Sequence, residues 1–510
     1  MGRAVADKVE ELIKAKDLKI MGLENRVRHL EEQLRLALYR AFGKSAEKLP
    51  GQDDLPFEDL KDDETPATIE TTVVAEHERR SKAGRKPLAD SLPRRDVQHN
   101  LTDAELTCAC GHQLTKIGDD IREKLVMVPA QVWVARHHHA KYACKHCEGL
   151  SDETKPGVIR AAGEPDLIAR SIVSAALLAY IWTAKFCDHL PFYRQEAGFA
   201  RIGAEISRQN MVNWTMTISG ELEPVTERIE ALIREGPLIN MDETPVKVLK
   251  MPHTGKEGQG YMWLARGGTK EKKAVRYRFA PGRGSQHAKA ILRNFRGYLQ
   301  TDAFSAYDVV AQDSQIIQVG CWAHARRKFM DAEKAAPSNL TKDAIGRIRK
   351  LYELEKTCRE HAKKQGLTDG EFLEHRKSVI EPFLKDLREW LDGNAAQTLP
   401  SGATGKAFAY TAGQWGKLVR FLDHPWLTPD NNLAENAIRP FVLGRKNWLF
   451  HGNEEGAEAS CRIYTLIETA KLNGLEPWVY LNTVLTKLPA VRISGDWESL
   501  LPWNINQGKN

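Results

Sequence analysis

Five short apolar runs lie close together near the middle of the chain, and they restrict its fold more than any other feature. They are rich in β-branched and aromatic residues and are bounded by glycine and proline, as strands are. They read GPLINMDE, GYMWLARGG, AVRYRFAPGR, GYLQTDAFSAYD and QIIQVGCWAH. Helical patterns flank them over residues 165–235, over 324–392 and from 431 onward. One sheet surrounded by helices is predicted, so the fold class is multidomain α/β plus α.

A narrow apolar seam runs along the helical stretch 5–42. Its residues are spaced alternately by three and four positions, as in a heptad repeat, and they are Ile20, Leu23, Val27, Leu30 and Leu34, continued by Ala37 and Ala41. Lys16 occupies a seam position, so the coil is short. The pattern predicts self-association, as a homodimer or a higher oligomer. The alternative is a helix that packs against its own protein.

Charge is distributed unevenly, although the net charge of the 510-residue chain is only +6. Residues 51–70 carry eight acids against Lys61 alone, and residues 71–100 carry seven Lys and Arg against four acids. This predicts a solvated linker that leads into a segment able to meet polyanions. The N-terminus has no secretory pattern, and the longest uncharged run, 171–184, is shorter than the roughly 20 residues of a membrane span. We therefore expect a cytosolic protein without a membrane partner.

Four of the eight cysteines form two close pairs, and these are Cys108, Cys110, Cys144 and Cys147. Paired cysteines in a chain without an export signal favour a metal over disulfides. Four thiolates suit a closed structural zinc site. One residue separates the first pair where zinc sites usually have two or more, so His112 and His146 are alternative ligands.

Two of the apolar runs each lead into an aspartate. Asp242 follows PLINM, and Asp302 follows YLQT. Two strands that end in an acid can bring the acids together if the strands lie side by side in one sheet. Strand side chains alternate between faces, so Glu243 should point away from Asp242. Glu243 remains the alternative first acid, because a change of register by one residue would exchange the faces.

A third acid, Glu435, lies in a basic stretch that also carries aromatic residues. Asp430 or Asn431 can cap a helix that begins near Leu433, and Pro440 is expected to end or kink it. The basic residues around Glu435 are candidates for DNA contact, and they are Arg439, Arg445 and Lys446. Such a setting suits a carboxylate that works beside a polyanion. Three carboxylates can hold two Mg²⁺ ions for phosphoryl transfer, with Mn²⁺ as a possible substitute.

The segment CWAHARRKF follows the fifth apolar run. Cys321 and His324 are three residues apart and would share one helix face. Two ligands are too few for zinc, so a structural role or a contact near the active site is expected. Arg326 and Arg327 belong to a basic cluster, for which phosphate contact and a solvated face are the two alternatives.

Taken together, these motifs resemble the transposase of insertion sequence family 66, and the resemblance covers nearly the whole chain. The motifs include MDETPV, LQTDAFSAY, CWAHARRKF, DNNLAENAIRP, RKNWLFHG and LIETAKLNGLEPWVYL. The resemblance implies a ribonuclease-H-like core in which Asp242, Asp302 and Glu435 match the acidic DDE triad. It also implies a helical insertion within the 132 residues between Asp302 and Glu435.

The resemblance further implies the reaction and the partners. The enzyme would cleave DNA at the terminal inverted repeats of a mobile element, and the freed 3′-hydroxyl would join target DNA. Helper proteins encoded by the same element and an association with the bacterial nucleoid are also implied. An inactive DNA-binding derivative and a metal-dependent nuclease such as a junction resolvase are the alternatives.

The chain is accordingly expected to consist of eight parts. In order these are a coiled coil (1–50), an acidic then basic linker (51–100), a zinc-binding β-rich module (101–152), a helical domain (153–235), the first part of the catalytic core (236–335), a mainly helical insertion (336–425), the Glu-bearing part of the core (426–475) and a helical tail (476–510). In the helical domain, the RIGAEIS turn joins two helices. This suits a helix-turn-helix-like DNA-binding unit or an ordinary packing module.

Overall fold

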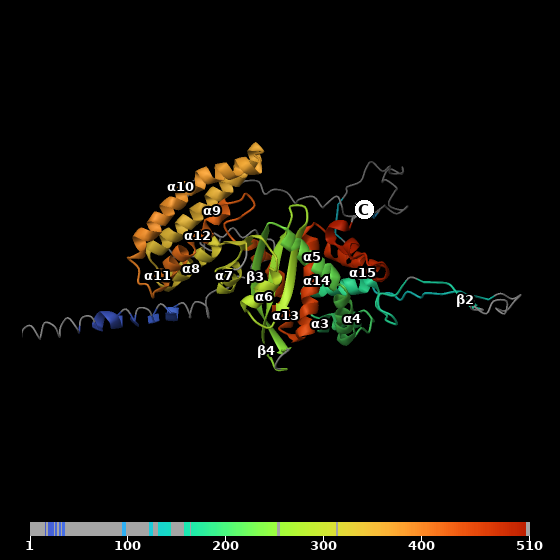
Figure 1. The fold of residues 1–510 in the computed structure, drawn as a ribbon. Helices are drawn as coiled ribbons and strands as arrows, with labels where there is room; N and C mark the ends of the chain where they lie inside the picture. Colours follow the sequence, from blue (N-terminus) through green and yellow to red (C-terminus); the bar gives the residue numbers. More distant parts are fainter. Residues whose placement is uncertain are drawn as a thin grey trace, which may run out of the picture. The chain divides into compact units, whose positions relative to one another are not determined.

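The computed structural model describes residues 165–251, 255–312 and 315–505, shorter stretches at 94–97, 122–125, 131–143 and 158–163, and scattered positions between 16 and 35 (Figure 1). A mixed sheet and many helices confirm the predicted α/β plus α class. The four paired cysteines, with His112 and His146, lie outside the described residues. No helix within the described ranges is both long and apolar enough to cross a membrane.

Near the N-terminus, the five seam residues from Ile20 to Leu34 are helical, and their exposed fractions are 52–60%. The coiled coil itself stays a prediction. In two of the short described stretches that follow, Arg94 Nε lies 2.7 Å from Glu123 Oε1. After them, β1 (Lys141–Ala143) and β2 (Val158–Arg160) pair antiparallel, with Lys141 opposite Arg160.

Four helices precede the sheet, and they are α2 (Ala175–Phe186), α3 (Phe192–Arg201), α4 (Arg208–Glu221) and α5 (Glu223–Glu235). The hydroxyls of Ser174 and Ser207 cap α2 and α4 by accepting hydrogen bonds from backbone N–H groups. The buried Trp182 Nε1 donates to Thr215 Oγ1 at 3.0 Å, which ties α2 to α4. The RIGAEIS turn lies between α3 and α4, so these are the two helices that it joins.

The predicted sheet forms, with all five expected strands and one short additional strand. The strands are β3 (Leu238–Lys250), β4 (Gly258–Gly268), β5 (Lys273–Ala280), β6 (Gly297–Gln300), β7 (Ile316–Val319) and β8 (His451–Asn453). Their order is β5-β4-β3-β6-β7, and β8 pairs with β3. The first three strands are antiparallel, whereas β6 and β7 run parallel to β3.

Helices cover both faces of this sheet and one of its edges. Cross-strand pairs place Asp242, Leu264 and Tyr277 on one face, against α13 (Asn432–Trp448), where the Tyr277 hydroxyl donates to the carbonyl of Ala437. The opposite face carries Glu243 and packs against α5, α6 (Ser285–Ile291) and α7 (Ser305–Gln312). Along the edge of β5, the hydroxyls of two threonines in α14 (Glu454–Leu472) accept hydrogen bonds from strand N–H groups. This contact closes the edge against further pairing.

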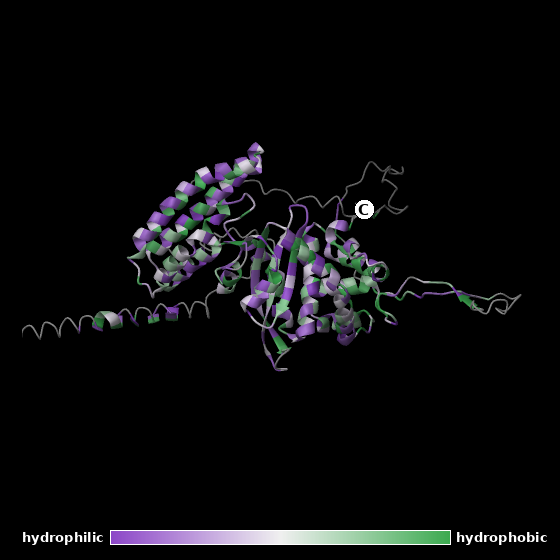
Figure 2. Ribbon diagram, viewed as in Figure 1, coloured by the Kyte–Doolittle hydropathy of each residue, from purple (hydrophilic) through white to green (hydrophobic). Residues whose placement is uncertain are grey.

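A second hydrophobic core lies among the helices that follow β7. These are α8 (Trp322–Ala335), α9 (Asn339–Gln365), α10 (Asp369–Ala395), α11 (Ala403–Gly413), α12 (Trp415–Leu418) and the 3-10 turn η2 (Arg420–Leu422). The helical stretch predicted for 324–392 is thus confirmed. Apolar residues alternate with polar ones along α9 and α10 in Figure 2, as expected for helices with one buried stripe. The last elements that the structure describes are α15 (Pro477–Ser494), η3 (Trp497–Leu500) and η4 (Pro502–Asn504).

Candidate active site

The central strand β3 lacks a neighbour on one side for part of its length, and Asp242 lies in that part. β6 pairs with β3 at residues 238–240, and β8 pairs with it at Val248 and Lys250. The positions between them have no partner on that side within the described sheet. The expectation that the strand ends at the acid is wrong, because β3 continues to Lys250. Asp242 therefore lies within a strand, at an opening in the sheet.

The register of β3 and β6 places the second aspartate beside the first. Asn240 lies opposite Gln300 in the parallel pair, and β6 ends there. Asp242 and Asp302 each follow these paired residues by two positions, so both acids leave the pairing at the same end. One carboxylate oxygen of Asp302 accepts a hydrogen bond from the Phe304 N–H at 3.0 Å, which fixes the turn after the strand.

Three buried amides link the strands to the segment that carries the third acid. Asn240 Nδ2 donates to Gln300 Oε1 at 3.0 Å and to Asn431 Oδ1 at 3.1 Å. Asn431 Nδ2 donates to the carbonyl of Met241 at 2.8 Å, and Gln300 Nε2 donates to that of Thr428 at 2.6 Å. Sequence analysis did not identify Asn240 or Gln300. A signal existed, because each lies two residues before a site aspartate and so on the same strand face.

Glu435 reaches the site from the first turn of α13. Asn431 is the N-cap residue, but its side chain makes no capping bond because it serves the amide network. Asp430 Oδ1 accepts instead from the N–H of Asn432 at 3.1 Å. The helix does not end at Pro440 but continues to Trp448. The turn before Glu435 is thus anchored to the sheet by buried side chains.

The negative charges of Asp302 and Glu435 both act on Asp242. Burial, together with the negative charges of Glu243, Glu435 and Asp302, raises the pKa of Asp242 to about 7. The hydrogen bond from the Glu243 N–H to Asp242 Oδ1, at 2.9 Å, acts in the opposite direction. Such a shift marks carboxylates that are held together before a cation joins them.

Glu243, the alternative first acid, is engaged on the opposite face of the sheet. Its side chain is 1% exposed and lies 2.5 Å from Arg283 Nη2. The Tyr307 hydroxyl donates to its other oxygen at 2.5 Å. Arg283 also stacks on the ring of Phe304, 3.8 Å from its centroid. Glu243 therefore has its own cation and its own donor, which favours Asp242 as the site acid.

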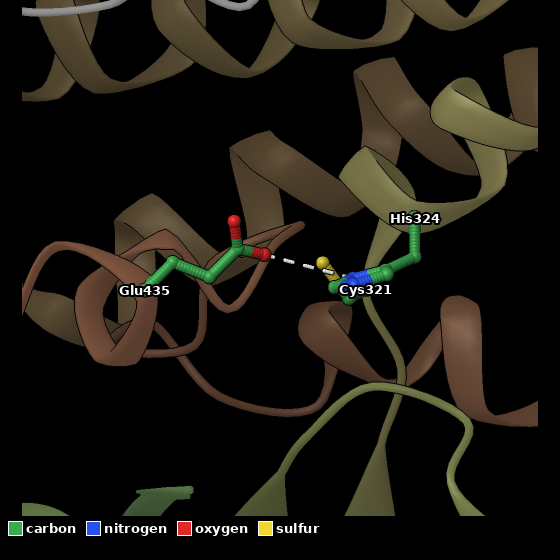
Figure 3. A group of neighbouring side chains, drawn as sticks. All are labelled: Cys321, His324 and Glu435. Atoms are coloured by element: carbon green, nitrogen blue, oxygen red, sulfur yellow. Dashed lines mark ion pairs between the residues drawn. The ribbon is translucent and has the colours of Figure 1, made fainter. Parts of the chain in front are cut away.

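Cys321 and His324 lie next to Glu435 (Figure 3). Cys321 is the residue at the N-cap position of α8, so it precedes the helix, and its side chain makes no capping hydrogen bond. One ligand atom from each of the three residues lies within 4.8 Å of the others, and His324 Nδ1 is 3.6 Å from Glu435 Oε1. Burial raises the pKa of the Cys321 thiol to about 12. Burial and the nearby Arg327 guanidinium together lower the pKa of His324.

The predicted basic residues differ in their accessibility. Arg326 is 5% exposed, so the expectation that it contacts phosphate is not supported. Arg327 is 55% exposed, and its Nη2 donates to Glu435 Oε2 at 3.3 Å. Arg445 Nη1 donates to Thr244 Oγ1 at 3.0 Å and also to a backbone carbonyl. Arg439 is half-buried and Lys446 is exposed.

The cluster fits divalent metal ions. Glu435 Oε1 is buried and accepts no hydrogen bond from the described residues, although His324 lies near it. Burial, and after it the neighbouring negative charges, raise the pKa of Asp242, so a bound cation would favour its charged form. Carboxylate oxygens are the ligands that Mg²⁺ prefers. Asp242, Asp302 and Glu435 are thus the residues that could hold it.

Comparison with known proteins identifies the class and then the family. A family model described as "Transposase IS66 family" matches residues 170–459. Its zinc-finger binding domain matches residues 105–148, and its C-terminal element matches 465–503. A model described as "Transposase C of IS166 homeodomain" matches residues 29–97. The protein is a member of a transposase family. It belongs to the IS66 family, as its sequence motifs indicated.

Three similar proteins come from Sinorhizobium fredii. The uncharacterized protein y4qI is 33% identical over 443 residues, which are 83% of this chain and 79% of that protein. The uncharacterized protein y4jD is 30% identical over 433 residues, covering 82% and 81%. The uncharacterized protein y4hP is 28% identical over 518 residues, covering 95% and 88%. The similarity therefore extends over most of each chain.

Proposed function

We propose that this chain is a DDE-type DNA transposase with a ribonuclease-H-like core. The main observation in support of this proposal is that three acids, from two parallel strands and one helix, converge at one place. The strand order β5-β4-β3-β6-β7, with three antiparallel strands and two parallel ones, supports the fold assignment. Membership in a transposase family supports the substrate, which is the terminal inverted repeats of a mobile element and target DNA.

Asp242, Asp302 and Glu435 are the proposed ligands of two Mg²⁺ ions, for which Mn²⁺ can substitute. Bound metals would activate the attacking oxygen and stabilise the leaving one in each phosphoryl transfer. The protein's own contribution is to hold the carboxylates in place before the ions bind. The buried amides of Asn240, Gln300 and Asn431 do this by joining β3, β6 and the start of α13.

The basic residues near the acids are proposed to contact DNA phosphates. Arg327 and Lys446 are exposed, and Arg439 and Arg445 lie half-buried on α13. Contacts of this kind position the nucleic acid without reading its sequence. Arg327 also neutralises Glu435, so a DNA phosphate or a metal ion at the site would compete for its contacts.

The zinc-finger match at residues 105–148 supports a structural zinc site. Its proposed ligands are Cys108, Cys110, Cys144 and Cys147, with His112 and His146 as alternatives. Self-association through the exposed N-terminal seam and cooperation with helper proteins of the same element are further proposals.

The test is a cleavage and joining assay with Mg²⁺ and a DNA fragment that contains the ends of the element carrying this gene. Wild-type protein should release element ends with a 3′-hydroxyl and join them to target DNA. The variants Asp302→Asn and Glu435→Gln should bind the fragment but not cut it. Asp343→Asn, an exposed acid on α9, is the matched control and should cut normally. Cleavage by both site variants at the wild-type rate would refute the assignment. Binding without cleavage by wild-type protein would favour the inactive derivative.

A further inference from the structure

The Cys321–His324–Glu435 cluster combines sulfur, nitrogen and oxygen ligand atoms at one point (Figure 3). Cys321 comes from the N-cap of α8, His324 from its first turn and Glu435 from the first turn of α13. Their side chains point toward one another across the gap between the two helices. A single small ion could therefore reach one atom of each residue.

Two of these ligand atoms lack hydrogen bonds. His324 Nδ1 and Glu435 Oε1 are both buried, and neither has a hydrogen-bond partner in the part of the chain that the structure describes. They face each other at 3.6 Å, which is too long for a hydrogen bond. Buried polar atoms are normally satisfied, and exceptions call for an explanation such as an ion that joins them.

The third ligand atom is positioned by the backbone. Cys321 Sγ accepts a hydrogen bond from the N–H of Asn431 at 3.3 Å. The same asparagine anchors the start of α13 through its side chain. A donor of this kind stabilises negative charge on sulfur, as the outer contacts of metal-bound ligands do. The network that positions Glu435 therefore also positions the thiol.

We propose that Cys321, His324 and Glu435 form a binding site for one transition-metal ion of the zinc type, distinct from the proposed zinc finger. Zinc is bound by thiolate, imidazole and carboxylate, whereas Mg²⁺ prefers oxygen alone. Three protein ligands leave one coordination position open to water or substrate, unlike the four of a closed structural site.

When the site holds no ion, the positive charge of Arg327 balances the negative charge of Glu435. Its Nη2 donates to Glu435 Oε2, and its Nη1 lies 3.1 Å from His324 Nε2. A guanidinium donates but does not accept, so His324 Nε2 is the acceptor and Nδ1 carries the proton. Metal binding at Nδ1 requires the other tautomer, and Arg327 must then leave Nε2. Arg327 is 55% exposed, so it can move into solvent.

This proposal depends on the proposed function in one respect only, which is that Glu435 is also one of the proposed Mg²⁺ ligands. Because one carboxylate belongs to both sets, occupancy of one site affects the other. The two proposals can nevertheless fail separately. Asp242 belongs to the Mg²⁺ set but not to this cluster, and Cys321 belongs to this cluster but not to the Mg²⁺ set.

The experiment uses full-length protein reconstituted with excess Co²⁺ and desalted. Cobalt replaces zinc at such sites, and its bond to a thiolate gives a charge-transfer absorption. Wild-type protein should retain one more equivalent of Co²⁺ than Cys321→Ser and His324→Gln, and it should show a stronger absorption. Cys187→Ser, a half-buried cysteine elsewhere, is the matched control and should equal wild type.

Two additional variants keep the outcome interpretable. His324→Gln changes a side chain that is 21% exposed, so it tests the site even if Cys321→Ser fails to fold. Asp242→Asn should lose DNA cleavage and keep the additional equivalent of Co²⁺, which separates this proposal from the proposed function. If folded His324→Gln retained the wild-type equivalents and absorption, the site would be refuted, whatever the cleavage assays showed.

Discussion

The helical insertion and the acidic site both hold carboxylates away from solvent. In the insertion the negative charge is paired with an arginine, whereas in the acidic site it lies near other negative charges. In the insertion, Glu355 is 6% exposed and makes two contacts with Arg376, at 2.7 and 2.8 Å. The pKa of Asp242 is instead raised by burial and, in addition, by the negative charges of Glu243, Glu435 and Asp302. A buried acid that has its own arginine is part of the structure. Acids that are held together against their repulsion are suited to bind a cation.

The two regions are also physically connected. Arg376 is fully buried and donates to the carbonyls of Phe421, His424 and Leu427, at 2.7, 3.2 and 3.0 Å. These carbonyls belong to the segment that leads directly into α13 and Glu435. The structural ion pair thus fixes the path of the chain before the third acid, and the insertion helps to assemble the site.

The largest expected effect compares the two neighbouring acids of β3. Asp242→Asn should lower Mg²⁺-dependent cleavage on the order of 10³-fold, because it removes a metal ligand at the reacting phosphate. Glu243→Gln should keep cleavage within roughly tenfold of wild type, since Glu243 faces Arg283 on the other side of the sheet. Single-turnover cleavage rates measure both. Equal losses would contradict the distinction between the two acids.

The next effect concerns stability. Arg376→Met should lower the free energy of unfolding by about 3 kcal/mol, because it removes the buried cation beside Glu355 and leaves only Arg359, which is 40% exposed and 2.6 Å away. Urea denaturation followed by tryptophan fluorescence measures this loss. Arg388→Met, which removes an exposed ion pair on α10, is the matched control and should cost less than about 1 kcal/mol. Similar losses in both variants would show that the buried pair has no special role.

The strands and the helices could be predicted because their signals are local, and the three acids were proposed from the same local patterns. Apolar runs mark β3 and β6, and an acid follows each run by a fixed number of residues. The insertion helices repeat apolar positions at helical spacing, so α8 to α10 were also predictable. Local patterns did not show that β3 continues past Asp242, because that depends on its pairing with β4 and β8.

The contacts between distant segments could not be predicted from one sequence. Asn240, Gln300 and Asn431 meet only because the register of β3 and β6 and the path of the insertion bring them together. The burial of Arg326 beside the exposed Arg327 depends on how α8 is rotated against its neighbours. Cys321 and His324 were noted as a pair, but the third ligand atom comes from Glu435, more than a hundred residues away.

A smaller effect tests the ion pair beside the site. Glu243→Gln should lower the free energy of unfolding by less than Arg376→Met, because burial raises the pKa of Glu243 and offsets part of what Tyr307 and the 40% exposed Arg283 contribute. Thermal unfolding measured in parallel with cleavage would report it. A loss as large as that of Arg376→Met would contradict this, because it would show that the exposure of Arg283 does not weaken its ion pair with Glu243.

The last prediction has the opposite sign from the others, since removing the charge of Asp242 should stabilise the protein. The pKa of Asp242 is raised from 3.8 to about 7, so between these values the folded chain retains a proton that the unfolded chain has released. The stability that this retained proton gives to the folded state is fully present below about pH 4 and is lost as the pH rises through about 7. In metal-free protein, Asp242→Asn should therefore be more stable than wild type by up to about 4 kcal/mol at pH 8, and equal to it near pH 4. Mg²⁺ at pH 8 should stabilise wild type more than the variant, because it binds the folded cluster. Thermal unfolding at both pH values, with and without Mg²⁺, measures this. A variant less stable than wild type in metal-free buffer at pH 8 would show that Asp242 is not held against repulsion, and the contrast with Glu355 would fail.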